Sequence, residues 1–196
     1  MTRAAPLPPE QRRAAIVDAA LSLLEDNGPE LTTRMVAEAA GVAEGTLFRV
    51  FPTLPDLLGA TYTEFLSHDR LMERLETVDL GETLESKTLG CVRGIVEYFT
   101  HIHAVLPPPR HETPPTHHAT CVRDAHQERF EDLRDWVVAT MSPHADALTV
   151  TPQTYAHFLK ALALGMAMAR TGGLTAEDIT RFALDGARRC HQSTRQ

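Results

Sequence analysis

Three features of this 196-residue sequence predict an all-α fold. Its 11 glycines are few and scattered, and the alternation of β-branched and polar residues that marks strands is nearly absent. Long stretches rich in Ala, Leu, Glu and Arg instead carry apolar residues at a spacing near 3.6. We therefore expect helices along most of the chain, joined by turns.

The first three predicted helices have recognisable start and stop signals. Prolines precede the first, and Asn27-Gly28-Pro29 ends it. A threonine caps the second, Gly41 interrupts it, and Pro52 follows the third. These helices are expected at about residues 10–26, from 32 or 33 to 40, and at 44–51.

Longer helices are predicted after Pro52. Residues 106–120 hold five of the 13 prolines, so regular structure is expected to fail there. Apolar periodicity marks the segments on either side of this loop. The expected helices run from 54 toward 81, and at about 82–103, 123–141, 152–170 and 175–191.

Composition excludes several classes of protein. No apolar stretch approaches the roughly 18–20 residues needed to span a bilayer, and the N-terminus lacks the apolar segment of a secretion signal. The three widely spaced cysteines form no disulfide framework, which predicts a reducing, cytoplasmic location. The net charge of −7 argues against non-specific binding of nucleic acid through overall positive charge, although it permits a local basic patch.

The most informative segment is 31–51, LTTRMVAEAAGVAEGTLFRVF. In a helix-turn-helix, a small residue lies where the two helices approach, and a residue that tolerates positive φ lies in the turn. Ala37 and Gly41 meet these needs, and Val36, Val42 and Leu47 supply apolar contacts. If these apolar residues are buried, the remaining residues of the second helix lie near the exposed side that would face a DNA groove. They are Glu44, Gly45, Thr46, Phe48 and Arg49.

From about residue 10 to 60 the sequence resembles the DNA-binding domain of the TetR (tetracycline-repressor-like) family of bacterial transcription regulators. The match includes LTTR, the AEAAGV turn, GTLF at the start of the recognition helix, and Phe51-Pro52 before an Asp-Leu-Leu run. The resemblance implies a helix-turn-helix domain at 1–53 and a helical effector-binding and dimerisation domain at 54–196. It also implies a ligand-responsive homodimer, usually a repressor, that a small molecule releases from a pseudo-palindromic operator.

The resemblance implies a DNA-binding role for particular residues. Thr33 and Arg34 would contact phosphate, with a base also in reach, and Glu44, Gly45, Thr46 and Arg49 would face base edges. Arginine suits such a role because its guanidinium pairs with guanine O6 and N7. Three positions depart from the family pattern: Phe48 replaces a tyrosine, Val50 a histidine and Leu54 a lysine, so three phosphate donors are missing. Arg3, Arg12 and Arg13 are the best substitutes.

The last two predicted helices carry broad apolar stripes with small residues among them. Such helices either close the core of the monomer or pair with their copies in a four-helix bundle, and the resemblance favours pairing. A two-fold dimer also holds two recognition helices about 34–36 Å apart, as a palindromic site requires. The predicted dimer interface comprises Tyr155, Phe158, Leu162, Met166, Ile179, Phe182 and Gly186.

An effector cavity is expected among the helices between residues 54 and 170. Its predicted lining is apolar or amphipathic, which favours a small, largely hydrophobic effector. Each of these residues also fits a plain core role. His103 and Trp136 are the stronger candidates because each carries a polar group that needs a partner when buried. The predicted lining comprises Phe65, Ile95, Phe99, His103, Phe130, Trp136 and Met166.

Two alternative functions compete with this prediction. Six of the ten histidines lie in residues 101–126, which raises a metal-responsive regulator as the alternative. However, no HxxxH or CxxC motif occurs, and solvent-facing loop histidines explain the cluster better. Catalytic motifs such as HExxH, GxSxG and the P-loop are absent as well. We therefore expect no enzyme activity, no cofactor and no bound metal.

Overall fold

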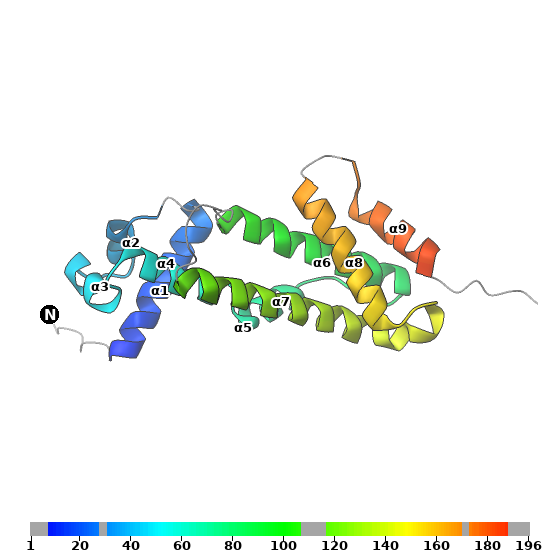
Figure 1. Cartoon of the computed structure of the whole chain (residues 1–196), viewed down its shortest axis with the longest axis horizontal. Helices are drawn as coiled ribbons and strands as arrows, with labels where there is room; N and C mark the ends of the chain where they lie inside the picture. The colour runs from blue at the N-terminus through cyan, green and yellow to red at the C-terminus, as the bar shows by residue number, and fades with distance from the viewer. Residues whose placement is uncertain (1–7, 28–30, 107–116, 170–172, 188–196) are drawn as a thin grey trace, which may run out of the picture. The chain divides into compact units, whose positions relative to one another are not determined.

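The computed structural model describes residues 8–27, 31–106, 117–169 and 173–187. Its helices dominate these ranges and confirm the all-α prediction (Figure 1). They are α1 (Pro9–Asn27), α2 (Thr33–Ala39), α3 (Glu44–Val50), α4 (Leu54–Phe65), α5 (His68–Glu76), α6 (Leu84–Val105), α7 (His117–Met141), the 3₁₀ helix η1 (Ser142–Ala147), α8 (Pro152–Ala169) and α9 (Ala176–Ala187). None of the described helices is both long enough and apolar enough to cross a membrane.

The chain divides into two compact units. Unit 1 consists of Met1–Arg70 and His103–Gln127, and unit 2 consists of Leu71–Ile102 and Glu128–Gln196. Each unit has its own group of buried apolar side chains.

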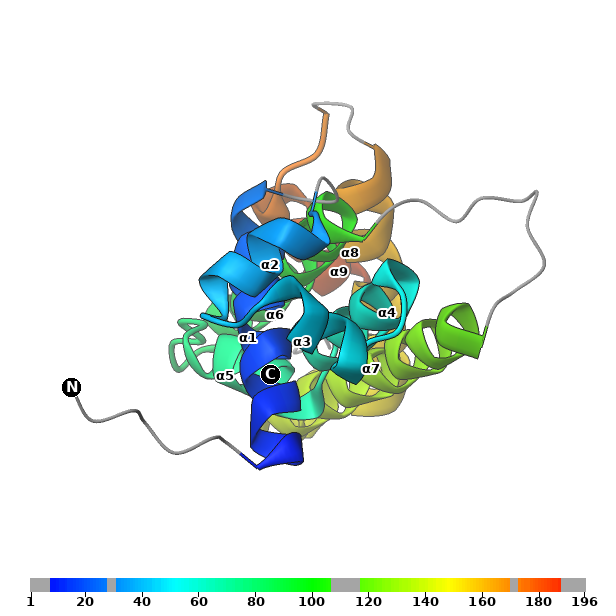
Figure 2. The same cartoon turned by 90° about the vertical axis from the view of Figure 1, so that its left-hand side faces the viewer.

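The core of unit 1 lies around α1, which packs against α2, α3 and α4 (Figure 2). Helices α2 and α3 have only seven residues each, too few to be stable alone in water. Burial of an Ile, Leu or Phe side chain contributes about 1.5–3 kcal/mol, so packing onto α1 stabilises both short helices. The buried set comprises Ile16, Val17, Ala20, Leu31, Val36, Ala37, Leu47, Phe51 and Leu57.

Hydrogen-bonded caps fix where the short helices of unit 1 begin. The Thr32 hydroxyl accepts from the backbone N–H of Met35 and caps α2. At the start of α4, Thr53 and Asp56 form a reciprocal capping box. Each cap therefore satisfies one of the N–H groups that the first turn of the helix leaves without an intrahelical partner.

The long helix predicted from residue 54 toward Gly81 is wrong, because the structure divides it into α4 and α5. Leu66 ends α4 with φ −91° and ψ 18°, outside the helical range. The Ser67 hydroxyl then accepts from the N–H of Arg70 at 3.5 Å and starts α5. The predicted loop at 106–120 is also partly wrong: α7 begins at His117, and only 107–116 lies outside the described residues.

Unit 2 is built on α6, with α7 and α8 supplying the buried residues opposite it. The Thr88 hydroxyl donates to the Leu84 carbonyl at 2.8 Å, so its one proton is used. The Tyr155 hydroxyl therefore donates to Thr88, 3.2 Å away, and joins α8 to α6 inside the core. Helix α9 packs beside α8, and Arg93 on α6 forms an ion pair with Glu177 on α9 (Figure 1).

Gly94 allows α6 to lie very close to its neighbours. A Cβ at this position would come within 3.2 Å of Trp136 Cη2 on α7 and of Val78 Cγ2, tighter than ordinary contact. Because glycine has no side chain, the indole of Trp136 packs directly against the backbone of α6 at Gly94.

Candidate functional site

Helices α2 and α3 form the predicted helix-turn-helix. Gly41 adopts φ +64°, and no atom lies within 4 Å of where its Cβ would be, so backbone conformation alone calls for glycine here. The N–H of Val42 donates to the Ala37 carbonyl at 2.9 Å and closes the turn. Val36 and Leu47 are fully buried, one from each helix, and lock the pair onto α1.

None of the predicted DNA-contacting residues is buried in the core, and this set is named the open face of α2 and α3. Thr33 and Thr46 are half-buried, whereas the others are exposed. Phe48 is 43% exposed, so its ring is left at the surface of α3. The exposed residues are Arg34, Glu44, Gly45, Phe48 and Arg49.

Two arginines on this face are available for an external partner. Among the described residues, no side chain forms an ion pair or hydrogen bond with Arg34 or Arg49. A guanidinium carries five N–H donors and stays charged at physiological pH. These two side chains therefore offer charge and donors to a ligand outside the chain.

Glu44, the first residue of α3, is instead tied to α2. The Thr33 hydroxyl donates to Glu44 Oε1 at 2.7 Å, across eleven positions of sequence. Both residues are predicted DNA contacts, but the bond between them was not predicted. No helical periodicity could have done so, because the bond depends on the angle between the two helices.

Of the three substitute phosphate donors, Arg13 has a defined contact. Its guanidinium lies over the ring of Phe51, with Cζ 4.4 Å from the ring centroid. Arg3 lies outside the described residues. Val50 and Leu54, at two positions where the family has donors, pack against the apolar core of unit 1.

A second candidate site lies in unit 2, where the Tyr98 hydroxyl is buried. The side chain is 8% exposed, and no described residue forms a hydrogen bond with its oxygen. Burial raises the pKa of Tyr98, so the group stays a neutral hydroxyl. A buried hydroxyl without a partner costs about 1–3 kcal/mol and marks a place for a ligand or water.

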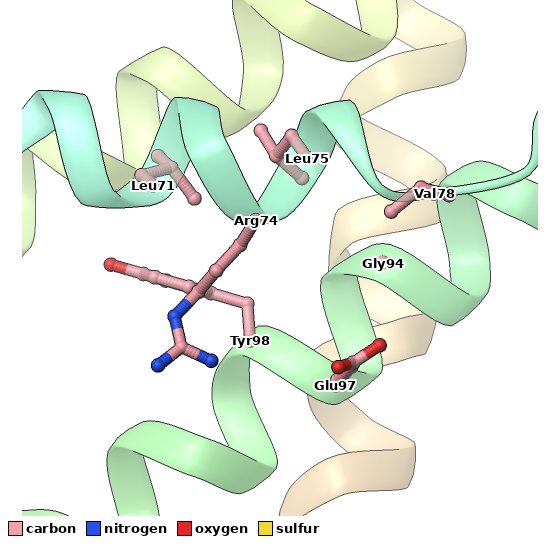
Figure 3. Close-up of a pocket in the computed structure, with 7 residues that line it drawn as sticks. All are labelled: Leu71, Arg74, Leu75, Val78, Gly94, Glu97 and Tyr98. Carbon is pink, nitrogen blue, oxygen red and sulfur yellow. The ribbon is translucent and has the colours of Figure 1, made fainter.

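The cavity beside Tyr98 is small, and α5 and α6 supply most of its wall (Figure 3). Its volume is about 10 Å³, room for about one water molecule. Arg74 extends from α5 alongside Tyr98, and its Nη2 lies 2.7 Å from His101 Nε2. Because arginine only donates, that ring nitrogen is the acceptor and His101 is neutral in this arrangement. The lining comprises Leu71, Arg74, Leu75, Val78, Gly94, Glu97 and Tyr98.

The structure brings together some of the predicted effector-binding residues. The ring centroids of Phe99 on α6 and Phe130 on α7 are 5.2 Å apart. The ring centroids of Phe99 and Tyr98 are 5.6 Å apart, in an edge-to-face arrangement. Trp136 packs at Gly94, next to the buried Ile95.

The other predicted effector-binding residues lie elsewhere. Phe65 and His103 belong to unit 1, the first buried and the second exposed, and Met166 is half-buried on α8. Tyr98 was missed, although it stands three residues after Ile95 on the same helical face as the predicted lining.

The predicted dimer residues fall into two groups. Tyr155 and Ile179 are buried inside unit 2, so their side chains are not available at its surface. Leu162 and Met166 are half-buried and Gly186 is exposed. Phe158 on α8 and Phe182 on α9 are 45% and 54% exposed, and Met168 and Leu174 are exposed apolar residues as well.

In the described part of the chain, no group of three or more His, Cys, Asp or Glu side chains is placed to hold a metal ion. His111 lies outside that part, and nothing is described of the side chains of His117 and His118. Burial raises the pKa of Cys91 to about 12, so this cysteine is a protonated thiol at neutral pH.

The turn with its left-handed glycine, the exposed residues of the second helix and the two arginines without a partner among the described residues are typical of a helix-turn-helix DNA-binding protein. Residues 16–61 match the family model of bacterial regulatory proteins of the tetR family. This N-terminal segment of the chain is thus a DNA-binding domain of the TetR family.

Solved structures of similar fold cover nearly the whole chain. NalD, the secondary repressor of the MexAB-OprM multidrug efflux pump in Pseudomonas aeruginosa, is 20% identical, with 92% of this chain and 98% of that chain covered and a TM-score of 0.53. SmeT, solved in complex with triclosan, is 17% identical, with 91% and 92% covered and a TM-score of 0.56. A TetR-family regulator from Streptomyces coelicolor is 19% identical, with 91% and 80% covered and a TM-score of 0.51. At these identities the likeness shows a shared fold.

Proposed function

We propose that the protein is a dimeric, ligand-responsive repressor whose two α3 helices bind a pseudo-palindromic operator. The observation that carries the proposal is the open face of α2 and α3, where Arg34 and Arg49 have no partner among the described residues. A DNA duplex supplies both phosphates for charge and guanine edges for bidentate pairing. Functionally, we assign residues 1–53 to DNA binding and 54–196 to effector binding and dimerisation.

The proposed dimer forms through α8 and α9. Phe158 and Phe182 are large apolar side chains left at the surface, one on each helix. Exposed apolar side chains on a terminal pair of helices are expected where those helices pair with their copies. We therefore narrow the predicted interface to Phe158, Leu162, Met166, Phe182 and Gly186, since Tyr155 and Ile179 are core residues.

The proposed effector is a small, largely hydrophobic molecule with one hydrogen-bonding group. Phe99 and Phe130 offer aromatic contact, and Tyr98 offers a hydroxyl that has no partner within the described chain. The cavity of about 10 Å³ is too small for such a molecule, so binding requires the α5 side chains to move. NalD is a repressor and SmeT forms a complex with triclosan, which supports repression and a small-molecule effector.

Effector binding at this site would act on DNA binding through α5 and α4. Only two residues separate α4 from α5, so movement of Leu71 and Arg74 displaces a segment linked directly to the DNA-binding unit. The effector shifts the equilibrium between binding-competent and released states by no more than its difference in affinity for the two.

Selection from a random-sequence duplex library, followed by affinity measurements at several salt concentrations, tests the proposal. We expect a palindromic consensus and an affinity that falls steeply as salt rises, because phosphate contacts release counterions. Arg49→Ala should lose most of the preference for that consensus. A folded dimer that enriches no sequence at low salt would overturn the proposed function.

A further inference from the structure

Glu44 is an acidic residue on a face that is otherwise suited to DNA. It is exposed at the first position of α3, and its carboxylate is held by the hydroxyl of Thr33 at 2.7 Å. No arginine of this face neutralises it: within the described residues, neither Arg34 nor Arg49 forms an ion pair with it. A carboxylate so placed repels phosphate, and it becomes favourable at DNA only where it accepts a hydrogen bond from a base.

The hydrogen bond with Thr33 leaves much of the carboxylate free. An ionised carboxylate has two oxygens and about four acceptor sites, and Thr33 uses one site on Oε1. Among the described residues no other side chain donates to Glu44. The second oxygen is therefore held at a defined position with its acceptor capacity intact.

Backbone space beside Glu44 is also open. The next residue, Gly45, is exposed, and a Cβ there would meet nothing within 4 Å. Its φ is not positive, so neither turn geometry nor packing within the described chain calls for glycine. Glycine inside a helix costs about 1 kcal/mol relative to alanine, and its use here fits close approach of an external surface.

The chemistry of the major groove selects one base for this carboxylate. Thymine and guanine present acceptors there, which a carboxylate rejects. Adenine presents its N6 donor beside the N7 acceptor, whereas cytosine presents the N4 donor without an acceptor of its own. A carboxylate is thus matched best to cytosine.

We propose that Glu44 is a specificity-determining residue that accepts a hydrogen bond from the N4 amino group of one cytosine in each operator half-site. Thr33 is its positioning residue: it orients the carboxylate instead of binding phosphate. This inference rests on the proposed function, because it requires sequence-specific binding through α3. A purely structural role for the Thr33–Glu44 bond would stabilise the helix pair without affecting base preference.

Selection from a random-sequence duplex library, carried out in parallel on the full-length wild type and four variants, separates these roles. Glu44→Gln keeps the shape and replaces the carboxylate with an amide, which pairs with adenine N6 and N7. Thr33→Val removes the hydroxyl, and Thr33→Ser restores it. Glu38→Gln is the matched control, since Glu38 is an exposed carboxylate on α2 outside the predicted contact set. Circular dichroism and thermal melts establish that each protein is folded.

We expect a wild-type consensus with one invariant cytosine in each half-site, preferred about tenfold or more over other bases. Glu44→Gln should change that position to adenine and leave the others as they were. Thr33→Val should reduce discrimination at the same position several-fold, while Thr33→Ser and Glu38→Gln should match the wild type.

Three results would overturn the inference. If wild type and Glu44→Gln enrich the same consensus, Glu44 does not contact a base, although the proposed function stands. If folded wild type enriches no sequence, the proposed function fails and the inference fails with it. A loss of affinity in Glu44→Gln and Thr33→Val without any change in base preference would assign the pair a structural role.

Discussion

Arg13 on α1 and Phe51 at the end of α3 form a cation–π contact, with the guanidinium carbon 4.4 Å from the ring centroid. Phe51 is buried, so the contact joins the surface of α1 to the core beneath the recognition helix. Such contacts contribute about 0.5–1 kcal/mol at exposed sites.

Replacement of Arg13 should therefore destabilise unit 1 slightly. We expect Arg13→Met to lower the free energy of unfolding in urea by about 0.5–1 kcal/mol. Arg34→Met is the control, because Arg34 has no partner within the described residues. Equal stability of the two variants would show that the contact with Phe51 contributes nothing.

Replacement of Phe48 by tyrosine is expected to raise the affinity for DNA. Phe48 is exposed on α3 where the family has tyrosine, and a restored hydroxyl would add a phosphate donor. Phe48→Tyr should bind the selected DNA about 2- to 10-fold more tightly, as expected for one added hydrogen bond. Val150→Thr, a small change at an exposed apolar residue outside both proposed sites, should leave DNA affinity unaltered in the same titration.

The two buried tyrosines of unit 2 should respond to loss of their hydroxyls in opposite ways. Tyr155 bonds to Thr88, so Tyr155→Phe should lower the free energy of unfolding by about 1 kcal/mol. Tyr98 has no partner among the described residues, so Tyr98→Phe should raise it by about 1 kcal/mol. Chemical denaturation of both variants checks this; a loss of stability in Tyr98→Phe would mean that its hydroxyl is already satisfied.

A charge in place of an exposed phenylalanine of α8 or α9 is expected to break the proposed dimer. Phe182→Glu should place a charge in the interface, and sedimentation should then show the 21.6 kDa chain instead of a species of twice that mass. Val150→Glu changes an exposed apolar residue outside both helices and should leave the mass unchanged. If Phe182→Glu still sediments as a dimer, α9 is not at the interface.

His126 predicts a pH dependence of stability. Burial, with His103 nearby, lowers its pKa below the ordinary value of 6.5, so the folded state favours the neutral ring. This stabilisation is complete above pH 6.5 and is lost as pH falls through the lowered pKa. His126→Gln should flatten the decline in unfolding free energy between about pH 7.5 and 5, while His157→Gln, at an exposed position of α8, should leave the decline as it is.

Local stereochemistry explains why the helix-turn-helix was predictable. A turn that needs positive φ requires glycine, and Gly41 in a chain with few glycines identified it. The break between α4 and α5 gave no such signal, because Leu66 and Ser67 interrupt neither the apolar periodicity nor helix propensity strongly. Only a serine cap marks the second start.

Surface roles were harder to predict than elements. A broad apolar stripe shows that a helix is buried, but it does not separate the side that faces its own core from the side that faces a partner. Tyr155 and Phe158 lie three residues apart on α8, yet one is buried and the other nearly half exposed. The roles of the DNA-facing residues remain predictions, because they depend on a partner outside the chain.

The close packing at Gly94 also provides an optical probe of the site. Trp136 is the only tryptophan in the sequence, and its Cη2 atom lies against α6 at the glycine that lines the cavity beside Tyr98. Any molecule that parts α5 from α6 there alters the surroundings of this indole. Intrinsic fluorescence of the unlabelled protein would then report effector binding directly, so a compound library can be screened before the operator is known.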